Sequence, residues 1–366
     1  MISGFATPEG TKKFAQNSGV NQTNFKEFEN LTLSNVGVGT YLGDADARTD
    51  ELVSAAVKQS ILSGVNVIDT AINYRAQKAE RSVGKAISEL IQENKINRDQ
   101  IFVSSKNGYV TNDADVQLGF WEYVKQEYTD KGVLKEGDVT SGYHCMTPTY
   151  LSDQLDRSLK NLDLECLDLM YLHNAVEGQI KDISKEQFLK NLQSVFELYE
   201  QKRDEGKIKF YGMATWECFR VSNDNPQYLS LEDTVNMAKK AGGENHGFKF
   251  IQLPFNLYYD QALLGKTQTI QNNPVSLLES ATRLGIGVFT SVPLMQGRLL
   301  QPGVMPEFSD LKPSMRALQF IRSSPGVIAP LVGQKSAEHV SENLEVMKIP
   351  PYSDDEFLGL VKKLTS

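Results

Sequence analysis

Residues 64–74, Gly-Val-Asn-Val-Ile-Asp-Thr-Ala-Ile-Asn-Tyr, contain a short run of β-branched and apolar residues that ends in polar ones. Such a run is typical of a buried β-strand. The segments 48–64 and 79–93, on either side of it, have the apolar spacing of amphipathic helices. Gly64 stands where a helix C-terminus needs a residue that tolerates positive φ. This part of the chain therefore predicts the order helix, strand, helix.

The same unit recurs along the chain. Eight short apolar runs alternate with helical patterns, at residues 36–40, 66–70, 101–105, 168–172, 209–214, 248–253, 286–291 and 327–332. Strands that alternate with helices form parallel sheets covered on both faces. Eight such units predict an α/β fold of the closed (β/α)8 type, a TIM barrel. An open, doubly wound sheet is the alternative that the pattern alone leaves.

The glycines of the first run do not have the spacing of a dinucleotide-binding motif. Gly37, Gly39 and Gly43 resemble G-x-G-x-x-G, but the third glycine is one residue late, and Asp44 and Asp46 follow. These carboxylates would repel a pyrophosphate at a helix N-terminus. We therefore interpret the glycines as the tight exit of the first strand and not as a Rossmann motif.

One interval between strands is longer than the others. The strand ends at Ser105 and Leu172 enclose an expected insertion at about residues 111–147, between strand three and its helix. Its aromatic residues fit either a lid over a pocket or a patch packed on outer helices. We expect it to border the active-site rim, so that trimming it changes substrate KM more than stability. We predict one barrel domain, residues 31–366, preceded by an N-terminal extension, residues 1–30.

The composition argues against several classes of protein. The 366 residues include 38 lysines and arginines against 46 aspartates and glutamates, for a formal net charge of −8. This balance argues against nucleic acid or an anionic membrane as a partner, and no apolar run is long enough to span a bilayer. Three widely spaced cysteines without a CxxC pair, and an N-terminus without an apolar signal core, predict a cytoplasmic protein.

Polar residues mark the C-terminal ends of the predicted strands: Asp69 and, on its loop, Tyr74, then Lys106, His173 and Gln252. Active sites of (β/α)8 barrels lie at this end, so these groups are predicted to converge. A nearby ammonium favours a phenolate, so Lys106 is expected to lower the pKa of Tyr74, with Asp69 keeping the lysine charged. His173 can then orient a carbonyl and stabilise the oxyanion formed as hydride arrives. Alternatively, Asp69 caps the segment that follows it.

Four segments of the chain resemble those of the aldo-keto reductases, which are (β/α)8-barrel, NAD(P)(H)-dependent oxidoreductases. They are GVNVIDTAINY, IFVSSKNG, DLMYLHN and PLVGQKSAEHVSENL, and the resemblance runs from about Val36 to about Asn343. The resemblance implies four catalytic residues, Asp69, Tyr74, Lys106 and His173. It also implies that the substrate, a small-molecule carbonyl or alcohol, binds at Tyr41, Tyr74 and His173.

The same resemblance implies NADP(H) as cofactor, with NAD(H) as the alternative. The expected cofactor-binding residues are Thr215, Gln252, Ser291, Val292, Leu294, Gln296, Gly297, Arg298, Gly333, Gln334, Lys335, His339, Glu342 and Asn343. The chain departs from the family pattern at three of these places. Ala214-Thr215 stands where Ser-Asn is frequent, Ser291 replaces an aromatic residue, and His339 replaces an arginine.

Two classes of function fit these residues. The first is an NADPH-dependent oxidoreductase that reduces an aldehyde or ketone, or oxidises the matching alcohol, with Tyr74 as general acid or base. The alternative is a weakly active or non-catalytic barrel that binds nicotinamide cofactor as a sensor or partner protein, which the altered Ala214 and Ser291 favour. No metal site is expected, because His144 and Cys145 lack ligand spacing to other histidines. The sequence does not specify the oligomeric state.

Overall fold

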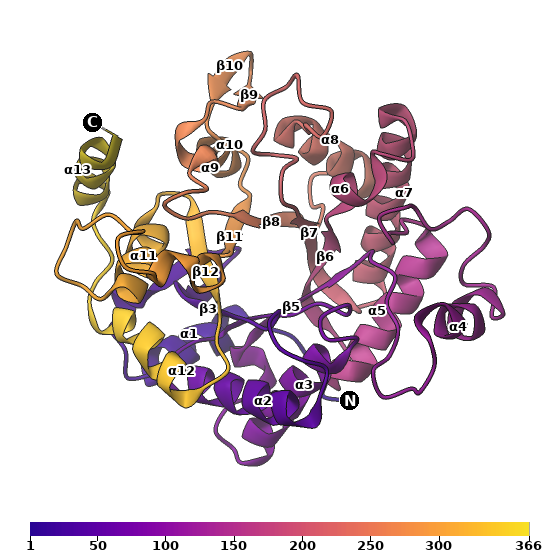
Figure 1. Cartoon of the computed structure of the whole chain (residues 1–366), viewed down its shortest axis with the longest axis horizontal. Coiled ribbons are helices and arrows are strands. Elements are labelled where there is room, and N and C mark those ends of the chain that lie inside the picture. Colours follow the sequence, from indigo (N-terminus) through magenta and orange to yellow (C-terminus); the bar gives the residue numbers. More distant parts are fainter. Residues whose placement is uncertain (366) are drawn as a thin grey trace.

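Eight parallel strands close into a barrel in the computed structural model, which describes residues 1–365 (Figure 1). The strands are β3 (Gly37–Gly39), β4 (Val67–Asp69), β5 (Phe102–Asn107), β6 (Leu167–His173), β7 (Ile208–Ala214), β8 (Phe248–Pro254), β11 (Gly287–Ser291) and β12 (Val327–Gly333). Their order around the barrel is β11-β12-β3-β4-β5-β6-β7-β8. The predicted (β/α)8 barrel is confirmed, and the open sheet is excluded. Residue 366, the predicted end of the domain, lies outside the described residues.

A ring of helices surrounds the barrel (Figure 1). Each barrel strand is followed by one of them: α2 (Ala47–Leu62), α3 (Lys78–Gln92), α5 (Pro148–Leu162), α7 (Lys185–Asp204), α8 (Leu231–Gly242), α10 (Leu277–Arg283), α11 (Pro313–Ser323) and α12 (Ala337–Leu344). Gly64, Gly206 and Gly285 follow the ends of α2, α7 and α10 with φ of 97°, 75° and 67°. These left-handed conformations are the helix ends that the sequence predicts.

Further elements lie between and after these helices. They are α6 (Ala175–Gln179), α9 (Gln261–Leu264), α13 (Asp354–Thr365) and an antiparallel hairpin of β9 (Gln268–Ile270) and β10 (Asn273–Val275). No helix within residues 1–365 has the length and apolar character that crossing a membrane requires.

Aromatic side chains fill the inside of the barrel. The ring centroids of Phe250 and Phe289 are 5.7 Å apart, and those of Phe102 and Phe250 are 5.4 Å apart. All three side chains are buried. The barrel is therefore a packed core and not a pore, which leaves its ends as the places for a binding site.

The N-terminal segment closes one end of the barrel. It contains α1 (Pro8–Asn17) and a hairpin of β1 (Phe25–Phe28) and β2 (Leu31–Ser34), which the sequence analysis did not identify. Two residues with left-handed backbone, Glu29 and Asn30, make the turn. Leu31 and Leu33 pack into the same buried cluster as the barrel phenylalanines, so the hairpin seals the end at which the strands begin.

A buried carboxylate ties this segment to the barrel. Asp168 accepts hydrogen bonds from the backbone N–H of Ala6 at 2.6 Å and of Val103 at 2.8 Å. It also accepts one from the Arg98 guanidinium at 2.7 Å. Because each oxygen of the buried carboxylate is paired, Asp168 joins the N-terminal segment, the start of β5 and β6.

The insertion between β5 and α5 lies at the outside of the helix ring, where Figure 1 shows α4 (Phe120–Val124) beside α5. A π-helical turn, Lys125–Thr129, continues α4. The rings of Tyr123 and Tyr128 are fully covered, and Tyr128 packs edge-on against Tyr150 of α5 at 5.3 Å. These contacts are those of a patch packed on outer helices.

Candidate active site

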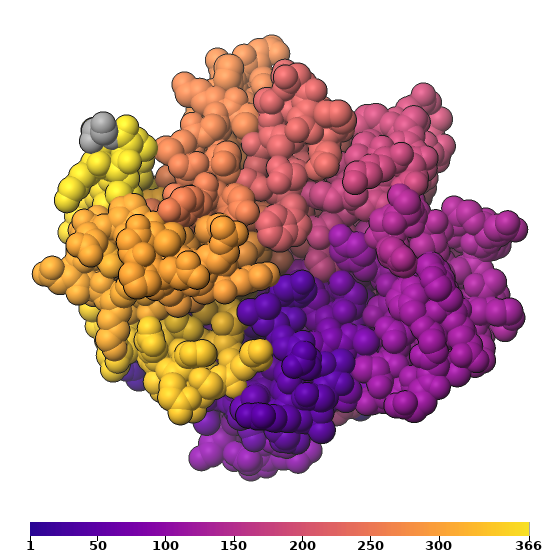
Figure 2. Space-filling view, viewed as in Figure 1, coloured from indigo at the N-terminus to yellow at the C-terminus, as the bar shows by residue number. Residues whose placement is uncertain are grey.

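A cavity of about 670 Å³ opens where the barrel strands end, and all eight strands or the segments directly after them contribute to its lining. Its volume lies within the ordinary range of small-molecule and cofactor sites. Figure 2 shows this face, on which the segments after β3 (indigo), β11 (orange) and β12 (yellow) meet. The cavity lies at the end of the barrel opposite the N-terminal hairpin, as expected for an active site in this fold.

Most of the site residues expected from the sequence line this one cavity. They are Tyr41, Asp69, Tyr74, His173, Thr215, Gln252, Ser291, Val292, Leu294, Gln296, Gly297, Gly333, Gln334, Lys335, His339, Glu342 and Asn343. Lys106 is fully buried behind Asp69. Arg298 is not brought to the cavity: the chain turns at Gln296 and Gly297, with φ of 55° and 88°, and Arg298 is exposed. Its part in cofactor binding stays a prediction.

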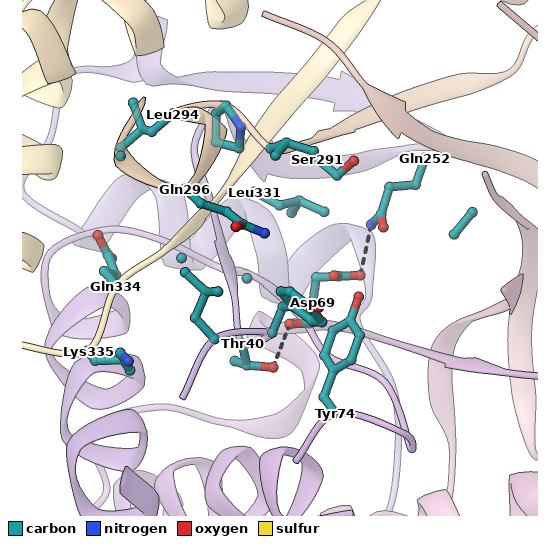
Figure 3. A pocket seen from close by; sticks show the side chains of 18 of the residues that line it. Thr40, Asp69, Tyr74, Gln252, Ser291, Leu294, Gln296, Leu331, Gln334 and Lys335 are labelled. Atoms are coloured by element: carbon teal, nitrogen blue, oxygen red, sulfur yellow. Dashed lines mark hydrogen bonds between the residues drawn. The ribbon is translucent and has the colours of Figure 1, made fainter. Parts of the chain in front are cut away.

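Asp69 and Lys106 form a buried ion pair on neighbouring strands. Lys106 Nζ lies 2.5 Å from Asp69 Oδ2 and donates a second hydrogen bond to the backbone oxygen of Thr70 at 2.8 Å. Asp69 Oδ1 accepts from Ser104 Oγ at 2.8 Å and from Gln252 Nε2 at 3.0 Å (Figure 3). Asp69 thus bonds across the barrel and not to the backbone N–H groups after it, so the capping alternative is wrong.

Tyr74 lies on the loop after β4, and its ring is held over the ion pair. The Lys106 ammonium is 4.9 Å from the centre of the ring. Figure 3 shows the phenol beside Asp69, with its hydroxyl directed into the cavity. Burial, with a smaller contribution from the Asp69 charge, raises the pKa of Tyr74 well above its ordinary value.

This direction corrects the expectation that Lys106 lowers the pKa of Tyr74. The main reason is the burial of the phenol, and the ammonium is also paired with Asp69, whose charge raises the pKa of Tyr74. Burial also lowers the pKa of Lys106 itself, and Asp69 opposes that change. Tyr74 is therefore a protonated phenol at neutral pH.

His173 ends β6 and faces Tyr74. The two ring centroids are 5.8 Å apart, and the ring of Tyr109 packs on His173 at 5.1 Å. Its Nδ1 is buried without a hydrogen-bond partner among residues 1–365. Burial and the Lys106 charge lower the pKa of His173 well below its ordinary value. The imidazole is therefore neutral and carries one donor N–H.

His144 of the insertion supports the backbone of His173. Its Nε2 lies 2.8 Å from the carbonyl oxygen of His173, while the Gln179 amide donates to Nδ1 at 3.0 Å. Burial lowers the pKa of His144 to about 4. A Cβ atom on Gly108 would come within 2.5 Å of this ring, so glycine is required there. His144 therefore has a structural role.

Three residues that the sequence analysis missed complete the aromatic end of the cavity: Tyr109, Asn174 and Trp216. Each follows a barrel strand within three residues, and that position was the available signal. The rings of Tyr41 and Tyr74 meet edge-on at 5.0 Å. Tyr41 is 58% exposed and Trp216 40% exposed, so both lie at the mouth.

The loop after β7 is held by a carboxylate. Glu177 Oε1 accepts from Thr215 Oγ1 at 2.7 Å and from the backbone N–H groups of Trp216 and Glu217 at 2.8 and 2.7 Å. The Thr215 hydroxyl is therefore already hydrogen-bonded within the protein.

Gln252 of β8 has one amide atom free for a ligand. Its amide nitrogen donates to Asp69, which leaves its amide oxygen as an acceptor for a bound molecule.

The loop after β11 carries a strained residue. Val292 has φ of 54°, which is an outlier for a β-branched side chain. The amide of buried Asn256 donates to its carbonyl oxygen at 2.9 Å and accepts from the backbone N–H groups of Tyr258 and Tyr259. Asn256, also missed from the sequence, therefore fixes this part of the cavity wall.

The opposite end of the cavity is polar. Gln334 donates to Ser60 Oγ at 2.9 Å and accepts from Asn343 Nδ2 at 3.0 Å, so these two amides hold the wall together. Lys335 lines the cavity just before α12, whose N-cap is Ser336. This end combines a cation with a helix N-terminus, which suits a phosphate group.

The insertion does not reach the cavity. Residues 111–147 contribute none of the lining, and the insertion packs on α5. The expectation that it borders the active-site rim is therefore wrong, and of the two alternatives the structure favours the patch over the lid. Within residues 1–365, no three His, Cys, Asp or Glu side chains gather as metal ligands would.

Comparisons with known proteins agree with this architecture. The model of the aldo/keto reductase family matches residues 35–307. An NADH-specific methylglyoxal reductase from Escherichia coli is 27% identical over 209 residues, which are 55% of this chain and 54% of that protein. This chain therefore matches about half the length of that curated relative.

Solved structures share the fold across most of the chain. An aldo/keto reductase from Klebsiella pneumoniae, in complex with NADP and acetate, has a TM-score of 0.60 and 23% identity, and covers 93% of this chain and 95% of its own. The holo form of an aldo-keto reductase from Bacillus halodurans has a TM-score of 0.61 and 18% identity, with 93% and 96% covered.

Proposed function

The chain belongs to the aldo/keto reductase family, and we propose that it is an NADPH-dependent oxidoreductase that reduces an aldehyde or ketone, or oxidises the matching alcohol. One observation carries the proposal. The Tyr74 phenol, whose raised pKa keeps it protonated, faces the cavity beside the Asp69–Lys106 pair and neutral His173. A positioned proton donor with charge-stabilising neighbours is what carbonyl reduction requires.

The cavity fits a nicotinamide dinucleotide in size and in the order of its groups. Figure 3 shows Lys335 and Gln334 at one end of the cavity, Leu294 and Gln296 between, and Gln252 and Tyr74 at the other end. In the proposal, Lys335 and the start of α12 hold the phosphate of the adenosine, and the free oxygen of Gln252 accepts from the carboxamide. When bound, the reduced cofactor supplies the hydride.

The protein residues act on the carbonyl oxygen. His173 donates a hydrogen bond that orients the carbonyl, and Tyr74 gives its proton to the oxygen as negative charge develops there. The phenolate that remains lies near the Lys106 ammonium, 4.9 Å from the ring centre, which stabilises it. Hydride on carbon and proton on oxygen complete the alcohol. In the reverse direction, the phenolate accepts the alcohol proton.

NADPH is the proposed cofactor because Lys335 is a cation at the polar end of the cavity, and a 2′-phosphate adds two negative charges there. Glu342 also lines this end but accepts a hydrogen bond from Ser314 at 2.7 Å. NAD(H) remains the alternative cofactor, and the curated relative is named as NADH-specific.

We also propose that the protein is cytoplasmic. All three cysteines are free and buried, which supports this location.

A two-step experiment tests this function against the non-catalytic alternative. Quenching of tryptophan fluorescence by NADPH and by NADH measures cofactor affinity. Consumption of NADPH at 340 nm is then followed with benzaldehyde, methylglyoxal and simple quinones as probes. Binding with turnover supports the oxidoreductase, whereas tight binding without turnover of any probe supports the sensor or partner protein.

A further inference from the structure

The three residues directly after the proposed acid, Tyr74, have unusual backbone conformations. Arg75, Ala76 and Gln77 all have positive φ, at 51°, 49° and 76°. A left-handed run of non-glycine residues is unfavourable and persists only where the surroundings hold it. This turn sets the direction in which the chain leaves Tyr74, so the groups that hold it also position the phenol.

Gln77 connects the turn to the surrounding structure through its side chain. Its side chain is 2% exposed. The amide nitrogen donates to the carbonyl oxygen of Asn112 at 3.1 Å and to the hydroxyl of Tyr123 at 3.3 Å, both in the insertion. The amide oxygen accepts from Asn161 of α5 at 3.1 Å. Every arm of a buried amide is therefore used to fix one residue of the turn.

A further backbone contact joins the insertion to the same turn. The N–H of Ala114 donates to the carbonyl oxygen of Ala76 at 3.1 Å. On the other side, Arg75 donates to Asp50 Oδ1 and to Ser82 Oγ, each at 2.8 Å. The turn is thus held from α2 and α3 on one side and from the insertion on the other.

We propose that the insertion is a positioning element for the Tyr74 hydroxyl, and that Gln77 is the positioning residue through which it acts. This inference rests on the proposed function of Tyr74. The insertion lies outside the cavity, so it sets the placement of the acid and leaves the binding of cofactor unchanged. Its loss therefore lowers kcat, because small misplacements of a reacting group are costly in rate.

Two substitutions test this, with one matched control. Gln77→Ala removes all three amide contacts, and Tyr123→Phe removes one while keeping the buried ring. Tyr128→Phe is the control, because it removes another buried hydroxyl of the insertion, which donates to Thr111 O and makes no contact with Gln77. We expect kcat to fall about tenfold in Gln77→Ala and about threefold in Tyr123→Phe. Cofactor Kd stays unchanged, and Tyr128→Phe retains the wild-type kcat.

A double-substitution cycle separates positioning from general destabilisation. In a Tyr74→Phe background, Gln77→Ala should cause no further loss, because the group that it positions is absent. Wild-type kcat in both Gln77→Ala and Tyr123→Phe would overturn the inference, and so would equal losses with and without Tyr74. If Tyr74→Phe alone keeps the wild-type kcat, the proposed function fails first, and the two failures are distinguishable.

Discussion

Lys106 Nζ lies 2.5 Å from Asp69 Oδ2, and the pair is buried directly beneath the ring of Tyr74. The ammonium donates hydrogen bonds to the Asp69 carboxylate and to the backbone oxygen of Thr70, and makes no hydrogen bond with the phenol. In the proposed reduction, its charge therefore matters most once the phenol has given up its proton, because a nearby cation stabilises the phenolate. The site therefore combines a protonated phenol with a nearby cation that can stabilise the phenolate formed when the proton leaves.

The first prediction concerns pH. The pKa of Tyr74 is raised, so its acid form persists as pH rises through the ordinary tyrosine value near 10. The pKa of His173 is lowered, so the neutral imidazole persists down to pH values below its ordinary 6.5. We expect kcat/KM for carbonyl reduction to stay flat between about pH 7 and 9.5. A basic limb centred near pH 8 would contradict this assignment of the acid.

The second prediction separates stability from rate at the ion pair. Lys106→Met leaves Asp69 buried without its counter-ion, which should cost about 3–5 kcal/mol of unfolding free energy. The double variant Asp69→Asn/Lys106→Met removes both charges and should regain most of that stability. We expect kcat to be highest in the wild type, lower in the double variant and lowest in Lys106→Met. The reason is that Lys106→Met alone leaves a negative charge beside the forming phenolate. Denaturant melts and single-turnover rates measure the two effects.

A third prediction concerns the opposite end of the barrel. Asp168→Asn weakens the contacts with Arg98 and Ala6, so the unfolding free energy should fall by about 3–5 kcal/mol. Because the contacts lie away from the cavity, kcat/KM at 25 °C should be unchanged. Asp156→Asn is the matched control, since its exposed pair with Lys207 should contribute about 1 kcal/mol at most. A drop in kcat/KM for Asp168→Asn would show that the two ends of the barrel are coupled.

The barrel strands could be predicted because they are continuous apolar runs, and the site because its residues follow those runs. The hairpin of β1 and β2 could not, since Phe25–Phe28 (Phe-Lys-Glu-Phe) is short and lacks the alternation of a half-buried strand, and Phe28 packs against Phe250 far along the chain. The direction in which the pKa of Tyr74 shifts could not be predicted either. It depends on how deeply the phenol is buried, and burial is set by the tertiary structure and not by the local sequence motif. The hydrogen bond between Gln77 and Tyr123 joins residues 46 positions apart, and no local sequence pattern predicts it.

The fourth prediction tests the polar end of the cavity. Lys335→Ala should raise the Kd of NADPH about tenfold, as expected for loss of a hydrogen bond to a charged group. The Kd of NADH should change less than twofold, because NADH lacks the 2′-phosphate. Lys348→Ala removes an exposed cation outside the cavity lining and serves as the control. Equal losses for both cofactors would place the role of Lys335 elsewhere than at the 2′-phosphate.

The most direct test of the account is the rate of hydride transfer in Tyr74→Phe. The substitution keeps the ring, its contacts with Tyr41 and His173, and the cofactor end of the cavity, and removes only the hydroxyl. In single-turnover experiments with NADPH bound, the rate should fall about 10²–10⁴-fold while cofactor Kd stays at the wild-type value. A single-turnover rate within threefold of wild type, on a substrate for which chemistry limits the rate, would contradict Tyr74 as the general acid.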